Sequence, residues 1–80
     1  MGKYKISFAK VTDIHTRESY ELECKTDEEA IQKAKEMMIY NFGEGFYVKV
    51  QRVKHYNGLR YYRQVYYGFY SKIKEEFIQL

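Results

Sequence analysis

The chain has 80 residues, of which 45% are hydrophobic and 31% charged, with 10 tyrosines and no proline or tryptophan. This composition is that of a folded protein, and the length allows one domain, residues 1–80, without an active-site cleft between two lobes. The single cysteine, Cys24, excludes an internal disulfide bond. No signal peptide or long apolar segment is present, so we expect a cytoplasmic protein without a membrane partner.

The formal net charge of +3 is distributed unevenly along the chain. Residues 1–44 hold seven lysines and arginines against nine acidic residues, a net of −2, whereas residues 45–74 hold seven lysines and arginines and no acid. This asymmetry predicts an acidic or phosphate-bearing partner for the C-terminal half. The alternative is that the basic segment lies beside the acidic N-terminal half and is neutralised within the molecule.

Two strands are predicted in the N-terminal part of the chain. Apolar and polar residues alternate from Tyr4 to about Val11, which predicts a strand with one buried face. Residues 12–18 are polar and predict a connecting loop. The alternation resumes from Tyr20 to Cys24 and predicts a second strand with an acidic outer edge.

A helix is predicted to begin at Thr26. The sequence Thr26-Asp27-Glu28-Glu29 is a capping box, in which the Thr26 hydroxyl accepts a hydrogen bond from the Glu29 amide. Apolar residues spaced three and four apart then form one stripe: Ala30, Ile31, Ala34, Met37 and Met38, with Ile39 at its margin. Asn41 or Gly43 ends the helix, since both tolerate the left-handed conformation.

Asn57-Gly58 predicts the turn of a long β-hairpin, because a type I′ turn needs positive φ at both central positions. Between Phe46 and Tyr70 the chain holds five basic residues, seven tyrosines and no acid. The two-residue turn sets Tyr56 opposite Leu59, and we extend this register along both strands. One face then carries the predicted core residues Phe46, Val48, Val50, Val65, Tyr67 and Phe69.

The same register makes two further predictions. Tyr47 lies opposite Gly68 and covers it on the second face. Arg52 lies opposite Arg63, and two facing arginines are costly to bury, so residues 51–64 are predicted to project as a basic arm.

Residues 71–80 allow two predictions. Ile73, Phe77 and Leu80 have helical spacing after Ser71, whereas the alternation from Glu75 to Leu80 permits an edge strand, and we favour the short helix. The predicted fold is therefore α+β, with the order ββαββ. One helix covers one face of an antiparallel sheet, a long hairpin occupies the C-terminal half, and a short helix ends the chain.

Catalytic and metal-binding patterns are missing from the sequence. His15 and His55 are the only histidines, and neither has a partner at triad or metal-ligand spacing. Cys24 is predicted to be a small buried hydrophobe rather than a nucleophile. Glu21 and Glu23 are predicted to be solvent-exposed residues on one face of a strand, not a catalytic pair of carboxylates. We therefore predict a protein that is not an enzyme and that holds neither a cofactor nor a metal ion.

The outer face of the hairpin and its arm combine cations, amides and phenol rings. The candidate partner-binding residues are Lys49, Gln51, Arg52, Lys54, His55, Arg60, Tyr62, Arg63, Gln64 and Tyr66. This chemistry suits base stacking with phosphate neutralisation, and it suits a protein partner equally, since tyrosine and arginine dominate interface hot spots. The alternative is that these tyrosines have no binding role and are present because tyrosine favours β-strands and has an amphipathic ring. Self-association into a homodimer through an exposed sheet edge is a third option.

The run SYELECKTDEEAIQKAKE, followed by a strand, an Asn-Gly-Leu hairpin and a further strand, resembles small anti-CRISPR proteins of phages and mobile elements. The resemblance covers about residues 4–70 and concerns the layout of one helix on an antiparallel sheet. It implies a non-catalytic inhibitor, in the cytoplasm of the host cell, that docks onto a CRISPR effector complex and occupies or alters a nucleic-acid path.

Two functional hypotheses follow. The first is a small inhibitory protein that binds a host protein or nucleoprotein complex through the basic, tyrosine-rich hairpin. The second is a protein that binds RNA or single-stranded DNA directly through the same hairpin face.

Overall fold

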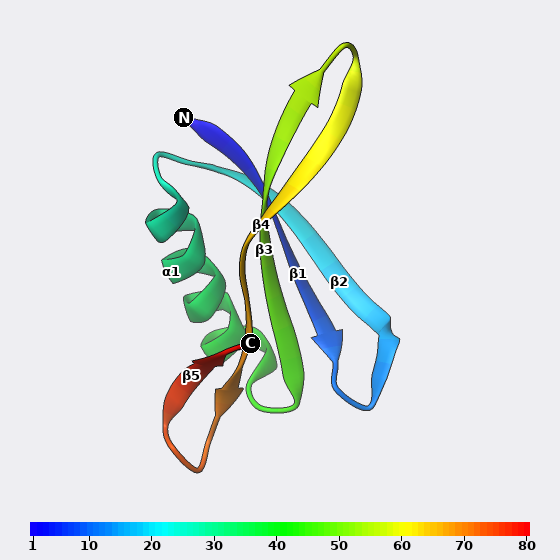
Figure 1. Cartoon of the computed structure of the whole chain (residues 1–80). Coiled ribbons are helices and arrows are strands. Elements are labelled where there is room, and N and C mark those ends of the chain that lie inside the picture. The colour runs from blue at the N-terminus through cyan, green and yellow to red at the C-terminus, as the bar shows by residue number, and fades with distance from the viewer.

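The computed structural model describes all residues, 1–80. Its elements are β1 (Gly2–Lys10), β2 (Asp13–Cys24), α1 (Asp27–Met37), the π-helical turn η1 (Met38–Phe42), β3 (Phe46–Tyr56), β4 (Leu59–Ser71) and β5 (Glu76–Gln79). The strands form one antiparallel sheet in the order β2-β1-β3-β4-β5, and α1 lies against one of its faces (Figure 1). We call this the helix face and the opposite one the open face. The predicted α+β fold, with one helix and a long hairpin, is confirmed.

The hydrophobic core lies between α1 and the helix face of the sheet. Its buried residues are Tyr4, Ile6, Phe8, Cys24, Ala30, Ala34, Met38, Val48, Val50 and Tyr66. The two alanines let the helix approach the sheet closely, and η1 adds Phe42, whose ring stacks on Phe8 with 4.3 Å between centroids. Burying each large apolar side chain contributes about 1.5–3 kcal/mol, so these few residues dominate the stability of so small a domain.

The connection between β1 and β2 is much shorter than predicted. Only Val11 and Thr12 form the turn, and β2 already begins at Asp13, so the predicted loop at 12–18 is wrong. The pairing is irregular there, because Ala9 pairs with Arg17 while Lys10 pairs with Asp13. A polar sequence forms a strand here because β2 lies at the edge of the sheet and these residues are all exposed.

The helix begins and ends as its sequence predicts. The Thr26 hydroxyl accepts a hydrogen bond of 3.1 Å from the Glu29 amide. The last turn widens into η1, which ends at Gly43 with a φ of 69°. Met38 is buried, whereas Ile39 is exposed to solvent, because it follows Ala30 by about two and a half helical turns and so lies on the opposite side of the helix. Neither α1 nor η1 has the length and apolar composition that crossing a membrane requires.

The hairpin turn is confirmed, but its register holds along only part of the strands. Asn57 and Gly58 have φ values of 52° and 78°, as a type I′ turn needs. From Tyr56 opposite Leu59 to Gln51 opposite Gln64 the pairing is the predicted one. The next pair joins Val50 to Tyr66, so Val65 is an extra residue and forms a β-bulge.

The bulge moves the rest of β4 to the opposite faces from those predicted, since a one-residue shift exchanges the two sides of a strand. Tyr66, predicted on the outer face, lies in the core and is only 6% exposed. Tyr67 and Phe69, predicted in the core, lie on the open face beside Tyr47. Gly68 lies opposite Val48, so the prediction that Tyr47 covers it is also wrong.

The last residues form an edge strand, and the short C-terminal helix that we favoured is wrong. Residues 72–75 turn, and β5 pairs antiparallel with the end of β4. This arrangement lets Phe77 pack on Tyr70, with 5.2 Å between ring centroids, and reach the margin of the core. It also depends on Gly68, because a Cβ atom there would lie 2.3 Å from the Ile78 carbonyl oxygen.

Candidate binding surface

The open face of the sheet is concave. Arg60 on β4 and Glu21 on β2 form an ion pair of 2.5 Å, although β1 and β3 lie between their strands. In a flat sheet these strands would be about 14 Å apart, with side chains standing perpendicular to the sheet. The sheet therefore curls around its open face, and Val53 is only 7% exposed on this face although no helix covers it.

A hollow of about 580 Å³ lies in the open face. Its lining residues are Lys5, Ser7, Ala9, Ile14, His15, Arg17, Ser19, Tyr47, Lys49, Gln51, Tyr62 and Tyr67, and they include no aspartate or glutamate. They come from β1, β2, β3 and β4, and the N-terminal half supplies seven of the twelve residues while the hairpin supplies five. We call this feature the hollow.

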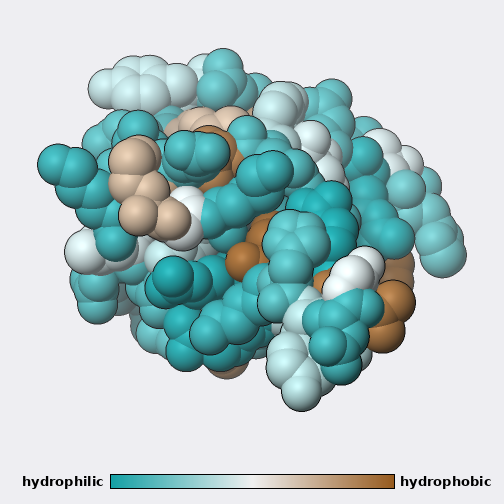
Figure 2. Space-filling view, turned by 90° about the horizontal axis from the view of Figure 1, so that it is seen from above, coloured by the Kyte–Doolittle hydropathy of each residue, from teal (hydrophilic) through white to brown (hydrophobic).

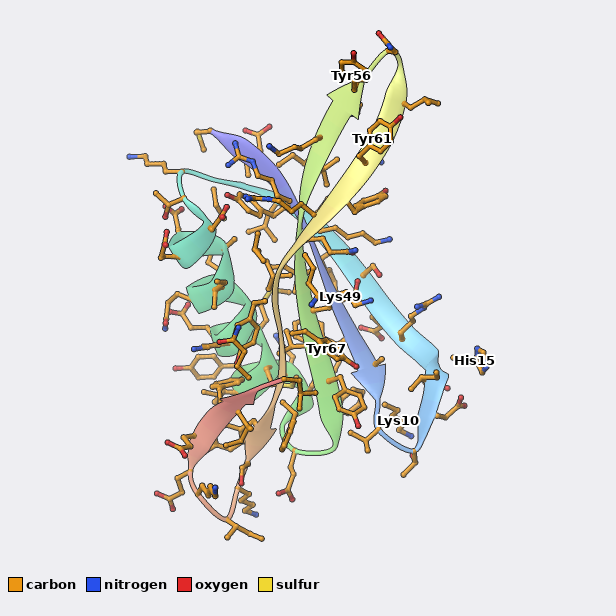
Figure 3. All side chains as sticks on the ribbon, in the orientation of Figure 1. Lys10, His15, Lys49, Tyr56, Tyr61 and Tyr67 are labelled. Carbon is orange, nitrogen blue, oxygen red and sulfur yellow. The ribbon has the colours of Figure 1, made fainter.

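Cations and tyrosine rings lie in contact within the hollow. The Lys49 Nζ atom is 5.8 Å from the centre of the Tyr67 ring, and the Lys5 Nζ atom is 5.2 Å from that of Tyr62. Figure 3 shows Lys49 and Tyr67 near the middle of the sheet, with His15 at the far end of the β1–β2 hairpin. In each pair the positively charged ammonium group of the lysine lies over the tyrosine ring, in the range of a cation–π interaction.

Three hairpin arginines form ion pairs within the molecule, with two carboxylates between them. Arg60 pairs with Glu21, while Arg52 and Arg63 both pair with Asp27 at the start of α1, at 3.8 Å and 3.1 Å. The hydrogen bond from Arg60 holds the pKa of Glu21 below its ordinary value. Internal neutralisation by the acidic N-terminal half, one of our two interpretations of the charge asymmetry, therefore applies to two of these three positive charges.

Asp27 also accepts a hydrogen bond from the hydroxyl of Tyr4, whose ring is fully buried. Burial, and then this hydrogen bond, raise the pKa of the Tyr4 hydroxyl above its ordinary value. The Arg52 guanidinium lies 5.7 Å from the centre of the same ring. Asp27 thus joins β1, β3 and β4 to the first turn of the helix, which is a structural role for two of the candidate binding residues.

The structure separates the ten candidate residues into three groups. Six belong to the open face: Lys49, Gln51, His55, Arg60, Tyr62 and Gln64. Arg52, Lys54 and Arg63 lie on the side of the helix face, and Tyr66 is in the core. Of the ten, only Lys49, Gln51 and Tyr62 line the hollow.

Other residues of the hollow were not among the predicted ones. Lys5 and Ser7 alternate with the core residues of β1, so their open-face position follows from the sequence. Their pairing with Gln51 and Lys49 does not, because it depends on β1 lying beside β3. Tyr67 could be assigned to this face only with knowledge of the bulge.

The end of the hairpin, residues 54–61, projects beyond the N-terminal end of α1 (Figure 1). This arm is shorter than the predicted segment 51–64, because Arg52 and Arg63 are held against Asp27. Tyr56, Leu59 and Tyr61 are exposed on the arm. Seen from above in Figure 2, the surface is mostly hydrophilic with small scattered hydrophobic patches.

Comparison of this chain with protein-family models, with curated proteins and with solved structures finds no match.

Proposed function

We propose that this protein is a non-catalytic docking protein that binds a phosphate-bearing partner through the open face of its sheet. The partner is a nucleic acid, either free or within a nucleoprotein complex. The observation that carries the proposal is the lining of the hollow, which holds Lys5, Arg17 and Lys49 and no carboxylate.

The distribution of ion pairs supports this surface over the three hairpin arginines. Lys5, Arg17 and Lys49 form no ion pair, whereas each arginine of the hairpin forms one. A cation without an internal partner gains more from a phosphate than one that must first release a carboxylate. The binding surface therefore includes both halves of the chain and excludes Tyr66.

The biological role that we propose is the one implied by the resemblance to anti-CRISPR proteins. A domain of this size, bound where a CRISPR effector complex guides its nucleic acid, would block that path without any catalytic step. The inhibition then depends on occupancy and requires a stable complex.

The test compares two pairs of neutralised cations. Lys49→Gln with Arg17→Gln removes charge from the hollow, and Lys72→Gln with Lys74→Gln removes the same charge from the exposed turn before β5. Binding of labelled single-stranded and duplex oligonucleotides is measured at about 50 and 200 mM salt. We expect the first pair to weaken binding and to reduce the salt slope by about 0.7–0.9 for each phosphate that is no longer neutralised, and the second to change little. Equal effects of both pairs, or no binding near about 50 mM salt, would exclude the hollow as a phosphate site.

A second candidate function is docking of the arm on a protein. The exposed Tyr56, Leu59 and Tyr61 favour it, because aromatic residues beside cations are typical of interface hot spots. Tyr56→Ala with Leu59→Ala should then abolish co-purification with a defined protein from nuclease-treated bacterial lysate, while oligonucleotide binding persists. Retention of that protein by the double variant would exclude the arm.

A further inference from the structure

We infer that the hollow is a binding site for single-stranded nucleic acid, in which bases stack on Tyr47, Tyr67 and Tyr62 beside cations that contact the phosphates. This inference rests on the proposed function, since it names the kind of phosphate-bearing partner. It adds a stacking role for Tyr67 and Tyr47 on the open face.

The two central tyrosines form a platform. Tyr47 and Tyr67 lie on adjacent strands, with 5.6 Å between ring centroids and 31° between ring planes. Both side chains are only half-buried, and no helix lies over this face. Each ring is held in place by its contact with the other and remains partly exposed to solvent, which suits it to stacking on a base. Such stacking tolerates any base, because every base has a π-face.

The cations are placed to hold a backbone beside stacked bases. Lys49 lies against the Tyr67 ring, and both Lys5 and Arg60 lie against the ring of Tyr62. Because Arg60 is already paired with Glu21, we assign the phosphates to Lys5, Lys49 and Arg17. This arrangement of positive walls around aromatic rings is the one that binds single strands with little sequence preference.

Uncharged polar groups complete the hollow. The hydroxyls of Ser7 and Ser19 lie 3.1 Å apart, and the Gln51 amide belongs to the same lining. These groups can donate to base edges and accept from them without repelling phosphate. Every nucleotide carries an aromatic base that can stack on the tyrosine platform, whereas the carboxylates of an acidic peptide would engage only the cations.

Concavity decides between single and double strands. The sheet curls around its open face, as the ion pair between Arg60 and Glu21 indicates. The tyrosines of the hollow therefore lie on a concave surface. In a duplex the bases are stacked on one another and expose only their edges, so the rings in the hollow cannot reach a base face. A single strand can turn its unstacked bases into the hollow while its phosphates remain at the walls.

The experiment measures binding of labelled oligothymidylate of about 12 nucleotides and of a duplex of the same length by fluorescence anisotropy. The variants are Tyr67→Ala, Tyr67→Phe and, as the matched control, Tyr61→Ala on the arm. We expect tighter binding of the single strand than of the duplex. Tyr67→Ala should weaken it about 5- to 150-fold at unchanged salt slope, since each stacked base contributes that much. Tyr67→Phe and Tyr61→Ala should bind like the parent chain.

The outcomes separate this inference from the proposed function. Equal or tighter duplex binding, or an unaffected Tyr67→Ala, overturns the single-strand site even if Lys49→Gln with Arg17→Gln weakens both probes. Competition by a polyglutamate peptide as strong as that by unlabelled oligothymidylate would assign the hollow to an acidic protein segment and also overturn it. Failure of both oligonucleotides to bind near about 50 mM salt overturns the proposed function itself.

Discussion

Tyr66 and Tyr67 are adjacent in the sequence, and the bulge at Val65 gives them opposite environments. Tyr66 is 6% exposed and packs in the core, where burial raises the pKa of its hydroxyl. Tyr67 is half-buried on the open face beside Tyr47 and Lys49. We therefore expect alanine at position 66 to destabilise the protein far more than alanine at position 67.

The magnitude follows from the size of the buried ring. Replacing a buried aromatic residue by alanine costs about 3–5 kcal/mol, while a domain of this length has about 4–12 kcal/mol of total stability. Tyr66→Ala should therefore remove about a quarter or more of the free energy of unfolding and lower the Tm by more than about 12 °C. Tyr67→Ala removes contacts on an uncovered face and should cost about 0.5–1 kcal/mol.

Urea denaturation followed by circular dichroism measures both costs, and Tyr66→Phe and Tyr67→Phe serve as controls that keep the rings. If Tyr66→Ala does not fold, Tyr66→Leu gives a smaller loss in the same direction. A larger loss for Tyr67→Ala than for Tyr66→Ala would mean that the hairpin register runs without interruption. The faces assigned to Tyr66, Tyr67 and Phe69 would then be wrong.

Three further predictions concern the packing around the sheet. Gly68→Ala should lower the free energy of unfolding by about 1–3 kcal/mol, because the added Cβ displaces the Ile78 carbonyl. It should also speed hydrogen exchange of the Leu80 amide, and an unchanged exchange rate would contradict the close approach of β5. Asp27→Asn should lower the free energy of unfolding by about 1–2 kcal/mol at low salt, because two arginines lose their carboxylate partner. The loss should be smaller in about 1 M salt, and a loss that does not depend on salt would argue against the ion pairs. The raised pKa of Tyr4 contributes stability that is complete below about pH 10 and is lost as the pH rises through the raised value, so Tyr4→Phe should flatten the alkaline decline of the urea midpoint. An equally steep decline in that variant would exclude Tyr4 as the titrating group.

Local sequence patterns determined most elements of this protein. The capping box at Thr26 and the left-handed residue at Gly43 set the two ends of the helical segment, and Asn57-Gly58 set the hairpin turn. Each depends on backbone geometry within a few residues, so the nearest neighbours in the chain are sufficient to specify it. The core residues of β1 and α1 were equally visible, because a period of two or of about three and a half marks the buried face directly.

Tertiary structure decided where the binding surface lies. The bulge at Val65 is formed by an ordinary β-branched residue, and it is favoured because it buries Tyr66 and lets β5 pack over Gly68. Only the order of the strands brings Lys5 and Ser7 of β1 beside Lys49 and Gln51 of β3. Only the curl of the sheet joins Arg60 to Glu21.

The sequence therefore determined that the hairpin is basic. It did not determine which of the basic side chains lack a carboxylate partner within the molecule. Arg52, Arg60 and Arg63 look like binding residues in the sequence, but in the fold they form ion pairs with two carboxylates of the N-terminal half. Lys49 keeps its charge free because no carboxylate reaches the hollow in which it lies. A side chain's charge is a property of its residue type, but its partner depends on which distant segments the core brings together.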